Sequence, residues 1–161
     1  METAYYDTPE GALGKRRWTL RRRYENGSSV CTLKTPLPDG SRGEWETECG
    51  DIMAAVPELC KLGAPEKLLT LTPGGLSEAC AARFTRLAKA LETEGAVVEL
   101  ALDRGVLLGG GKALPFSEVE VELKSGAEAA AAAFAGGLAE EFGLTPEPKS
   151  KVQRAMELTQ P

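Results

Sequence analysis

Hydrophobic and charged residues alternate along several stretches of this chain with a period of two. A period of two is typical of a β-strand whose two faces differ. The clearest stretch is residues 118–124, which read Glu118, Val119, Glu120, Val121, Glu122, Leu123 and Lys124. Three carboxylates on one face lie about 7 Å apart and repel one another unless a metal ion or several cations lie between them. For a single strand, the alternative is a sheet edge with a solvated acidic face.

The same alternation predicts strands at residues 17–24, 29–34, 42–48 and 96–103. Asn26 and Gly27 separate the first two, which predicts a tight hairpin turn. Basic residues of these two strands are in register, and this destabilises a sheet unless an anion lies between them. The charged positions of these strands include Arg21, Arg23, Lys34, Arg42, Glu44, Glu46, Glu48 and Asp103.

Capping residues and propensity predict the remaining elements. Asp51 precedes a helix over residues 52–62, which Pro57 could split, and a second helix covers residues 127–142. Residues 66–72 favour a strand, and residues 103–105 favour a turn. Residues 76–91 are ambiguous: their composition favours a helix, whereas the strand at 96–103 needs a hairpin partner.

Composition narrows the possible functions. The chain has 161 residues, 42% of them hydrophobic and 27% charged, which indicates one globular domain. A net charge of -5 argues against a general nucleic-acid binder, and neither a membrane span nor a signal peptide is apparent. The four cysteines lack metal-site spacing, so we expect free thiols and a cytoplasmic protein. The absence of histidine excludes Ser-His and Cys-His catalysis and histidine metal sites.

Acidic and basic residues are segregated by strand. We therefore expect an α+β fold: an antiparallel β-barrel with helices packed outside and charged faces lining a water-filled interior. Arginine binds phosphate oxygens through its planar fork, and carboxylates bind Mg²⁺ or Mn²⁺. The pattern thus favours a site for a polyphosphate and a divalent metal.

Five stretches, in this order and spacing, resemble the CYTH superfamily of triphosphate tunnel metalloenzymes. They are Tyr5-Tyr6-Asp7-Thr8-Pro9, Leu20-Arg21-Arg22-Arg23, Thr32-Leu33-Lys34, residues 118–126 and residues 150–154. The resemblance implies an antiparallel β-tunnel with outer helices that hydrolyses or cyclises triphosphate compounds with two divalent cations. It also favours a strand over residues 83–91, as the partner of residues 96–103.

The resemblance also implies residue roles. It suggests that the phosphates meet a set of cations that are also the catalytic candidates: Arg21, Arg23, Lys34, Arg86 and Lys151, with Arg42 as a further substrate contact. It suggests that the metal ligands come from Glu44, Glu46, Glu118, Glu120, Glu122 and Asp103.

The family's opening Glu-x-Glu-x-Lys strand is absent from this sequence. We therefore expect residues 1–161 to form a single, N-terminally truncated domain of about seven strands, open at one side. A start assigned too late, a degenerate or regulatory member, and a rearranged fold or partner-supplied strand would each explain the difference. The exposed edges would favour a homodimer.

The resulting expectation is metal-dependent hydrolysis of a triphosphate, most simply inorganic triphosphate. The alternatives are a catalytically incomplete module that binds polyphosphate or nucleotide, and a thiamine triphosphatase or adenylate cyclase. No nucleic-acid or membrane partner is expected.

Overall fold

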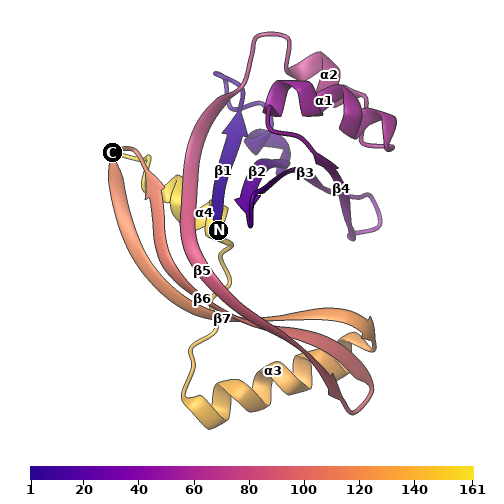
Figure 1. Cartoon of the computed structure of the whole chain (residues 1–161), viewed down its shortest axis with the longest axis vertical. Helices are drawn as coiled ribbons and strands as arrows, with labels where there is room; N and C mark the ends of the chain where they lie inside the picture. The colour runs from indigo at the N-terminus through magenta and orange to yellow at the C-terminus, as the bar shows by residue number, and fades with distance from the viewer.

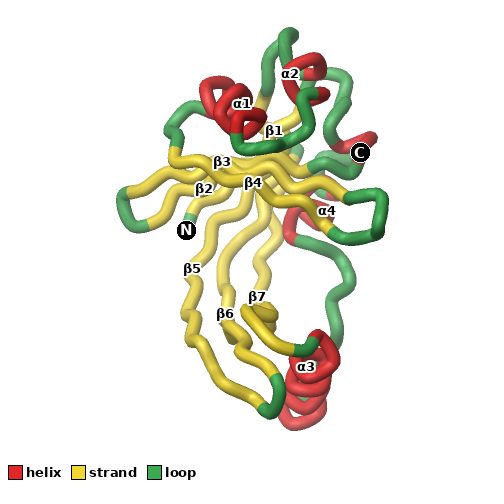
Figure 2. The backbone as a smooth tube through the Cα atoms, turned by 90° about the vertical axis from the view of Figure 1, so that its right-hand side faces the viewer, coloured by secondary structure: helices red, strands yellow, loops and turns green.

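The computed structural model describes all residues from 1 to 161 and contains one antiparallel sheet of seven strands. The strand order is β4-β3-β2-β1-β5-β6-β7, so β4 and β7 form two free edges. The sheet curls into a half-barrel that stays open on one side (Figures 1 and 2). The strands are β1 Glu2–Asp7, β2 Thr19–Glu25, β3 Ser28–Pro36, β4 Arg42–Glu48, β5 Ser77–Thr93, β6 Ala96–Gly109 and β7 Lys112–Gly126. The predicted fold class, with about seven strands and an open side, is confirmed.

Four α-helices accompany the sheet: α1 Ile52–Lys61, α2 Lys67–Leu71, α3 Glu128–Phe142 and α4 Lys151–Glu157. None of them is both long enough and apolar enough to cross a membrane. Figure 2 shows α1 and α2 above the sheet formed by β1–β4, and α3 beneath the far end of β5–β7.

Tight turns join β2 to β3 and β6 to β7. Asn26 and Gly27 both have positive φ, at 51° and 83°, as expected for the predicted hairpin between β2 and β3. Gly110 and Gly111, at 56° and 74°, make a similar turn between β6 and β7.

The largest apolar cluster lies between α1 and the outer face of β2 and β3. Leu20 and Leu33 from the strands pack with Val56 and Leu59 from the helix, and all four are buried. Asp51 begins α1 as predicted, because its carboxylate accepts hydrogen bonds from the backbone N–H groups of residues 53 and 54 at 2.8 and 2.9 Å. Pro57 lies within α1 without splitting it.

A second cluster places α3 on the outer face of β6 and β7. Val98 and Ala131 are buried there, with Val121 and Phe134 packed against them. The helix ends at Gly143, which adopts the left-handed conformation.

The helix α4 packs on the other face of the sheet. Its Ala155 is fully buried with Tyr5, Phe84 and Leu107. Ser150 and Gln153 form a reciprocal capping box at its start.

Two local predictions were wrong. The stretch 66–72 contains the short helix α2 (Lys67–Leu71) instead of a strand, because Pro65 starts a helical turn and Leu68 becomes fully buried in the outer cluster. Residues 103–105 continue β6 instead of turning. Gly105 pairs there with Phe84 on one side and Phe116 on the other, and the two rings meet edge to face at 5.8 Å.

The strand predicted over residues 83–91 is confirmed as part of β5 despite the helical composition of this stretch. The backbone of β5 is hydrogen-bonded to β1 along its first part and to β6 along most of its length. Tertiary pairing therefore outweighs local propensity here.

Two glycine substitutions test this packing, because they should change the free energy of unfolding in opposite directions. A Cβ at Gly105 would lie 2.0 Å from the carbonyl oxygen of Arg83, so Gly105→Ala must displace backbone and should lower the free energy of unfolding by about 2 kcal/mol. A Cβ at Gly136 in α3 meets nothing within 4 Å, so Gly136→Ala should raise it by about 0.5–1 kcal/mol. Urea denaturation measures both, and equal effects would contradict this account of Gly105.

Candidate functional site

The strand register places the predicted site residues on one face of the sheet, opposite to α1 and α3. Directly paired residues point to the same side of a sheet. Tyr5 pairs with Arg21, and Arg21 pairs with Thr32, which pairs with Glu46. Further along the sheet, Arg86 pairs with Asp103, and Asp103 pairs with Glu118. This charged face carries Arg21, Arg23, Lys34, Arg42, Glu44, Glu46, Arg86, Asp103, Glu118, Glu120 and Glu122.

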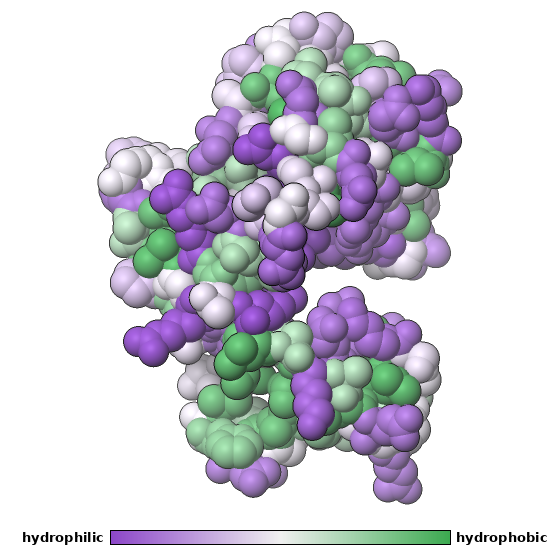
Figure 3. Space-filling model, in the orientation of Figure 1, coloured by the Kyte–Doolittle hydropathy of each residue, from purple (hydrophilic) through white to green (hydrophobic).

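Hydrophilic residues border the opening of the half-barrel. In Figure 3 they gather between the part that holds α1 and α2 and the part that holds α3. A cleft of about 1150 Å³ includes Arg42 from the β4 edge together with Glu118 and Glu120 from the β7 edge. The two edges of the sheet therefore border a common space.

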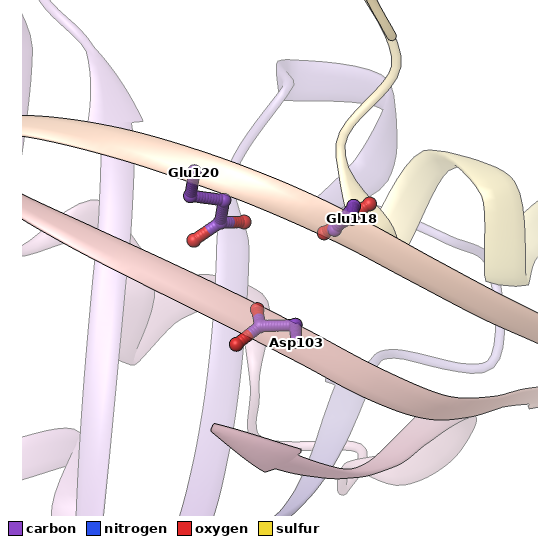
Figure 4. Close-up of side chains that lie close together, drawn as sticks. All are labelled: Asp103, Glu118 and Glu120. Carbon is purple, nitrogen blue, oxygen red and sulfur yellow. The ribbon is translucent and has the colours of Figure 1, made fainter. Parts of the chain in front are cut away.

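Three carboxylates converge on β6 and β7: Asp103, Glu118 and Glu120, which we call the acidic triad. One oxygen from each lies within 4.8 Å of the others, and Figure 4 shows their side chains directed toward one another. Asp103 is 1% exposed, so its negative charge requires close partners.

Three cations neutralise the acidic triad. Arg86 donates to both oxygens of Asp103 at 2.7 Å and to Glu120 at 2.5 Å. Lys151 contacts Asp103 at 2.8 Å and also forms ion pairs with Glu118 and Glu120. Arg154 forms an ion pair with Glu118. Carboxylates and cations are thus equal in number, and together they form one network.

The network shifts the pKa values of Asp103, Glu120 and Lys151 toward the charged forms. Burial alone would raise the pKa of Asp103, but hydrogen bonds from Arg86 and Lys151 bring it below its usual value. The pKa of Glu120 is lowered for the same reason, chiefly by Lys151. Burial alone would lower the pKa of Lys151, but hydrogen bonds to the three carboxylates raise it.

Two aromatic rings support the cations. The Lys151 Nζ atom lies 5.1 Å from the ring centroid of Phe84 and 5.6 Å from that of Phe116. The guanidinium of Arg86 lies over Phe84 at 5.7 Å, and that of Arg154 over Phe116 at 5.5 Å. The aromatic faces attract the positive charges and limit their contact with water.

The basic half of the charged face differs from the acidic half because its arginines have no carboxylate partner. Arg21 and Arg23 take part in none of the ion pairs, and the Nε atom of each is buried without a hydrogen-bond acceptor. The pKa of Arg23 is lowered by burial and by the positive charges of Arg21 and Arg86. Such uncompensated cations are suited to bind an anion.

The other predicted residues lie outside the acidic triad. Lys34 pairs with Glu44 at 3.0 Å on β3 and β4, and Glu46 lies beside Glu44. Burial and the neighbouring Glu44 raise the pKa of Glu46. Glu122 is largely exposed and pairs with Lys124 at 3.1 Å. The structure therefore joins Asp103, Glu118 and Glu120 directly, whereas Glu44, Glu46 and Glu122 remain separate from them.

Arg154 is a site residue that the sequence analysis did not predict. It lies three residues after Lys151 on α4, and the two cations share a face of the helix. This spacing is visible in the sequence, but only a helix prediction for the closing segment would have made it informative.

The comparisons with known proteins agree with this architecture. The family model of the CYTH domain matches residues 1–156. An inorganic triphosphatase from Haemophilus influenzae is 31% identical over 128 residues, which cover 78% of this chain and 36% of the relative. The chain thus spans about a third of the length of that relative.

Two solved structures share the fold. One is a protein from Bacillus halodurans with a provisional adenylate cyclase assignment, with a TM-score of 0.65 and 20% identity, covering 95% of this chain and 80% of that one. The other, from Hippeastrum, is a provisional adenylyl cyclase with a dominant triphosphatase activity. Its TM-score is 0.56 at 18% identity, covering 99% of this chain and 82% of that one.

The buried position of Asp103 leads to a stability prediction for the metal-free protein. Asp103→Asn leaves Arg86 and Lys151 undercompensated and should lower the free energy of unfolding by about 3 kcal/mol at pH 7. The exposed control Glu122→Gln should cost less than about 1 kcal/mol.

The pH dependence follows from the direction of the Asp103 shift. A carboxyl whose pKa is lower in the folded state stabilises the protein above its unfolded pKa of about 3.9, and this stabilisation disappears as the pH falls through the folded pKa. The difference between the native protein and Asp103→Asn, measured by urea unfolding in EDTA, should therefore shrink below about pH 4. A difference that stays constant down to pH 2 would contradict the proposed role of the charge.

Proposed function

Because the chain belongs to the CYTH domain family, we propose that it hydrolyses a triphosphate on the charged face of its sheet. The simplest such reaction is hydrolysis of inorganic triphosphate, with Mg²⁺ or Mn²⁺ as cofactor. The observation that carries this proposal is the contrast between Arg21 and Arg23, which lack carboxylate partners, and the acidic triad on the same face.

Two relatives support the choice of reaction. The matching Haemophilus influenzae protein is an inorganic triphosphatase, and the Hippeastrum protein of the same fold has a dominant triphosphatase activity. Hydrolysis requires only water as the acceptor, whereas cyclisation requires a nucleotide ribose held in a particular orientation.

Arg21, Arg23 and Lys34 are the proposed phosphate contacts. A guanidinium forms two parallel hydrogen bonds to phosphate oxygens, and a buried guanidinium binds more strongly than a solvated one. Arg86, Lys151 and Arg42 complete the proposed substrate contacts. Arg21, Arg23, Lys34, Arg86 and Lys151 would also stabilise the negative charge that develops as the phosphoanhydride bond breaks.

The acidic triad fits a divalent cation. Its oxygens are hard ligands of the kind that Mg²⁺ and Mn²⁺ prefer, and they already converge within 4.8 Å. When bound, such an ion neutralises phosphate charge and lowers the pKa of a coordinated water. We propose Glu44 and Glu46 on β4, together with Glu122, as further metal ligands. They would contact a metal ion only when the substrate is bound.

A binding module without turnover is the second candidate. It is favoured by one observation: every carboxylate of the acidic triad already has a side-chain cation as its partner. In that case the arginines would still bind polyphosphate or a nucleotide, but no metal would reach the carboxylates. Thiamine triphosphate and a cyclase reaction on ATP are further substrates to assay.

The proposal places the protein in the cytoplasm, where its four free cysteines would remain reduced. The free edges of β4 and β7 could pair with a second copy, which would make a homodimer. Residues 1–161 are proposed to act as one domain.

Phosphate release from inorganic triphosphate tests the function. With Mn²⁺ or Mg²⁺ present, Arg23→Gln should lower kcat/KM by about 10- to 100-fold, because one charged hydrogen-bonding group is lost from the phosphate site. Glu120→Gln should reduce metal-dependent turnover. The matched control is Arg83→Gln, since Arg83 lies on the outer face, where it is largely exposed beside Glu2.

The melting temperature, measured with and without triphosphate, separates the two candidate functions. A triphosphate-induced rise in melting temperature without turnover would favour the binding module. If neither turnover nor a thermal shift is seen, or if Arg83→Gln has the same effect as Arg23→Gln, the phosphate site proposed here is wrong.

A further inference from the structure

Two of the three cations that neutralise the acidic triad come from α4. Lys151 and Arg154 reach the carboxylates from this helix, whereas Arg86 belongs to β5. Lys151 alone forms ion pairs with all three carboxylates, so its Nζ atom occupies the point on which they converge. It is also only 9% exposed.

That point is the position that a metal ion would take. A divalent ion binds carboxylate oxygens at about 2.0–2.6 Å, and it cannot share the same oxygens with an ammonium group at hydrogen-bond distance without strong repulsion. The acidic triad can therefore hold either Lys151 or a metal ion, but not both in the observed arrangement.

We propose that α4 is a cationic latch: Lys151 and Arg154 compete with a divalent cation for the acidic triad, so that metal binding displaces them from the carboxylates. This inference rests on the metal site of the proposed function. It adds that the site is closed by the chain's own side chains until the ion replaces them.

Charge balance sets the extent of the exchange. Three carboxylates now face three side-chain cations. A divalent ion added to this set would leave two excess positive charges around the buried Asp103, which is unfavourable. Release of the two α4 cations restores neutrality, and Arg86 remains because it is bound to both oxygens of Asp103 from the neighbouring strand.

The attachment of α4 allows such a movement at its first turn. The residues 143–150 that connect it to α3 are exposed and include Pro146 and Pro148. Lys151 and Arg154 follow directly in the first turn of the helix. Figure 1 shows this connector as an irregular segment, and no backbone hydrogen bond joins its residues 145–149 to the sheet.

The other end of α4 is held more firmly. Gly109 approaches the carbonyl oxygen of Ala155 so closely that a Cβ there would lie 2.4 Å from it. Lys112 donates to the carbonyl oxygen of Gln160 at 2.8 Å, and Ala155 is fully buried. The helix is therefore expected to move at its first turn while its end stays on the hairpin between β6 and β7.

Manganese affinity of the full chain, without substrate, tests the competition. Measured by electron paramagnetic resonance or calorimetry, the Kd for Mn²⁺ should fall about tenfold in Lys151→Gln and also fall in Arg154→Gln, because a competitor for the same ligands is removed. The matched control is Lys149→Gln on the same segment, where the lysine pairs only with Glu157 at 2.7 Å. Its Kd should remain unchanged.

Hydrogen exchange of the native protein provides a second measurement that does not depend on the folding of a variant. Saturating Mn²⁺ should speed exchange of the amides of Gln153 and Arg154, which donate to Ser150 in the first turn, at least about fivefold, whereas those at 107–112 should not change. Native Mn²⁺ binding with unchanged exchange, or with no tightening in Lys151→Gln and Arg154→Gln, would overturn the latch and leave the metal site standing. Absence of any Mn²⁺ binding, in the native protein and in both variants, would overturn the latch together with the metal part of the proposed function.

Discussion

Mutual repulsion among Asp103, Glu118 and Glu120 is the constraint on which the rest of the charged face depends. Their oxygens lie within 4.8 Å of one another, and Asp103 has almost no contact with water. At such distances and in a partly dry environment, uncompensated carboxylates would cost several kcal/mol. Cations from two separate elements compensate this charge: Arg86 on β5, and Lys151 and Arg154 on α4. The position of α4 on the sheet thus depends on electrostatics as well as on the burial of Ala155.

The sheet can carry this charged face because its other face is covered. Leu20, Leu33 and Val98 alternate with charged positions along their strands and pack beneath α1 or α3. The apolar packing outside stabilises the strands, and the curl of the sheet brings Arg42 of the β4 edge and Glu118 and Glu120 of the β7 edge to a common cleft. The site is therefore a consequence of the two-sided strand pattern rather than of an added loop or domain.

The sequence predicted most of this arrangement where the information is local. Alternation identified β2, β3, β4 and parts of β6 and β7, and it assigned Arg21, Arg23, Glu118 and Glu120 to the charged faces of their strands. Asn26-Gly27 located a hairpin, whereas the strand over residues 83–91 followed from the hairpin requirement and the family resemblance. Pairing between distant segments, such as Tyr5 with Cys80, leaves no local signal. The same limitation explains why Gly105 suggested a turn, since its function is to admit two aromatic rings from the neighbouring strands.

The composition of the acidic triad also depends on contacts between distant segments, which the sequence does not reveal. The family resemblance suggested Glu46 and Glu122 as metal ligands together with Glu120. The alternation places each on the charged face of its strand but does not give the distances between residues of different strands. The structure separates them: Glu122 turns to Lys124, whereas Asp103 joins Glu118 and Glu120. Arg154 was absent from the prediction for a related reason, since its contact with Glu118 joins residues 36 positions apart.

The two halves of the charged face differ in how their charges are paired, and this difference favours one order of ligand binding. The acidic half is neutral without any ligand, whereas Arg21 and Arg23 keep positive charges and buried Nε atoms that no protein group satisfies. Under the proposed function, a polyanion would therefore gain most by binding first over β2, where it would replace repulsion between the arginines by attraction. Its negative charge would then also attract the cations now held by the carboxylates. Anion binding at the basic half and the proposed release of cations at the acidic half would favour each other, because both steps reduce the same imbalance of charge across the face.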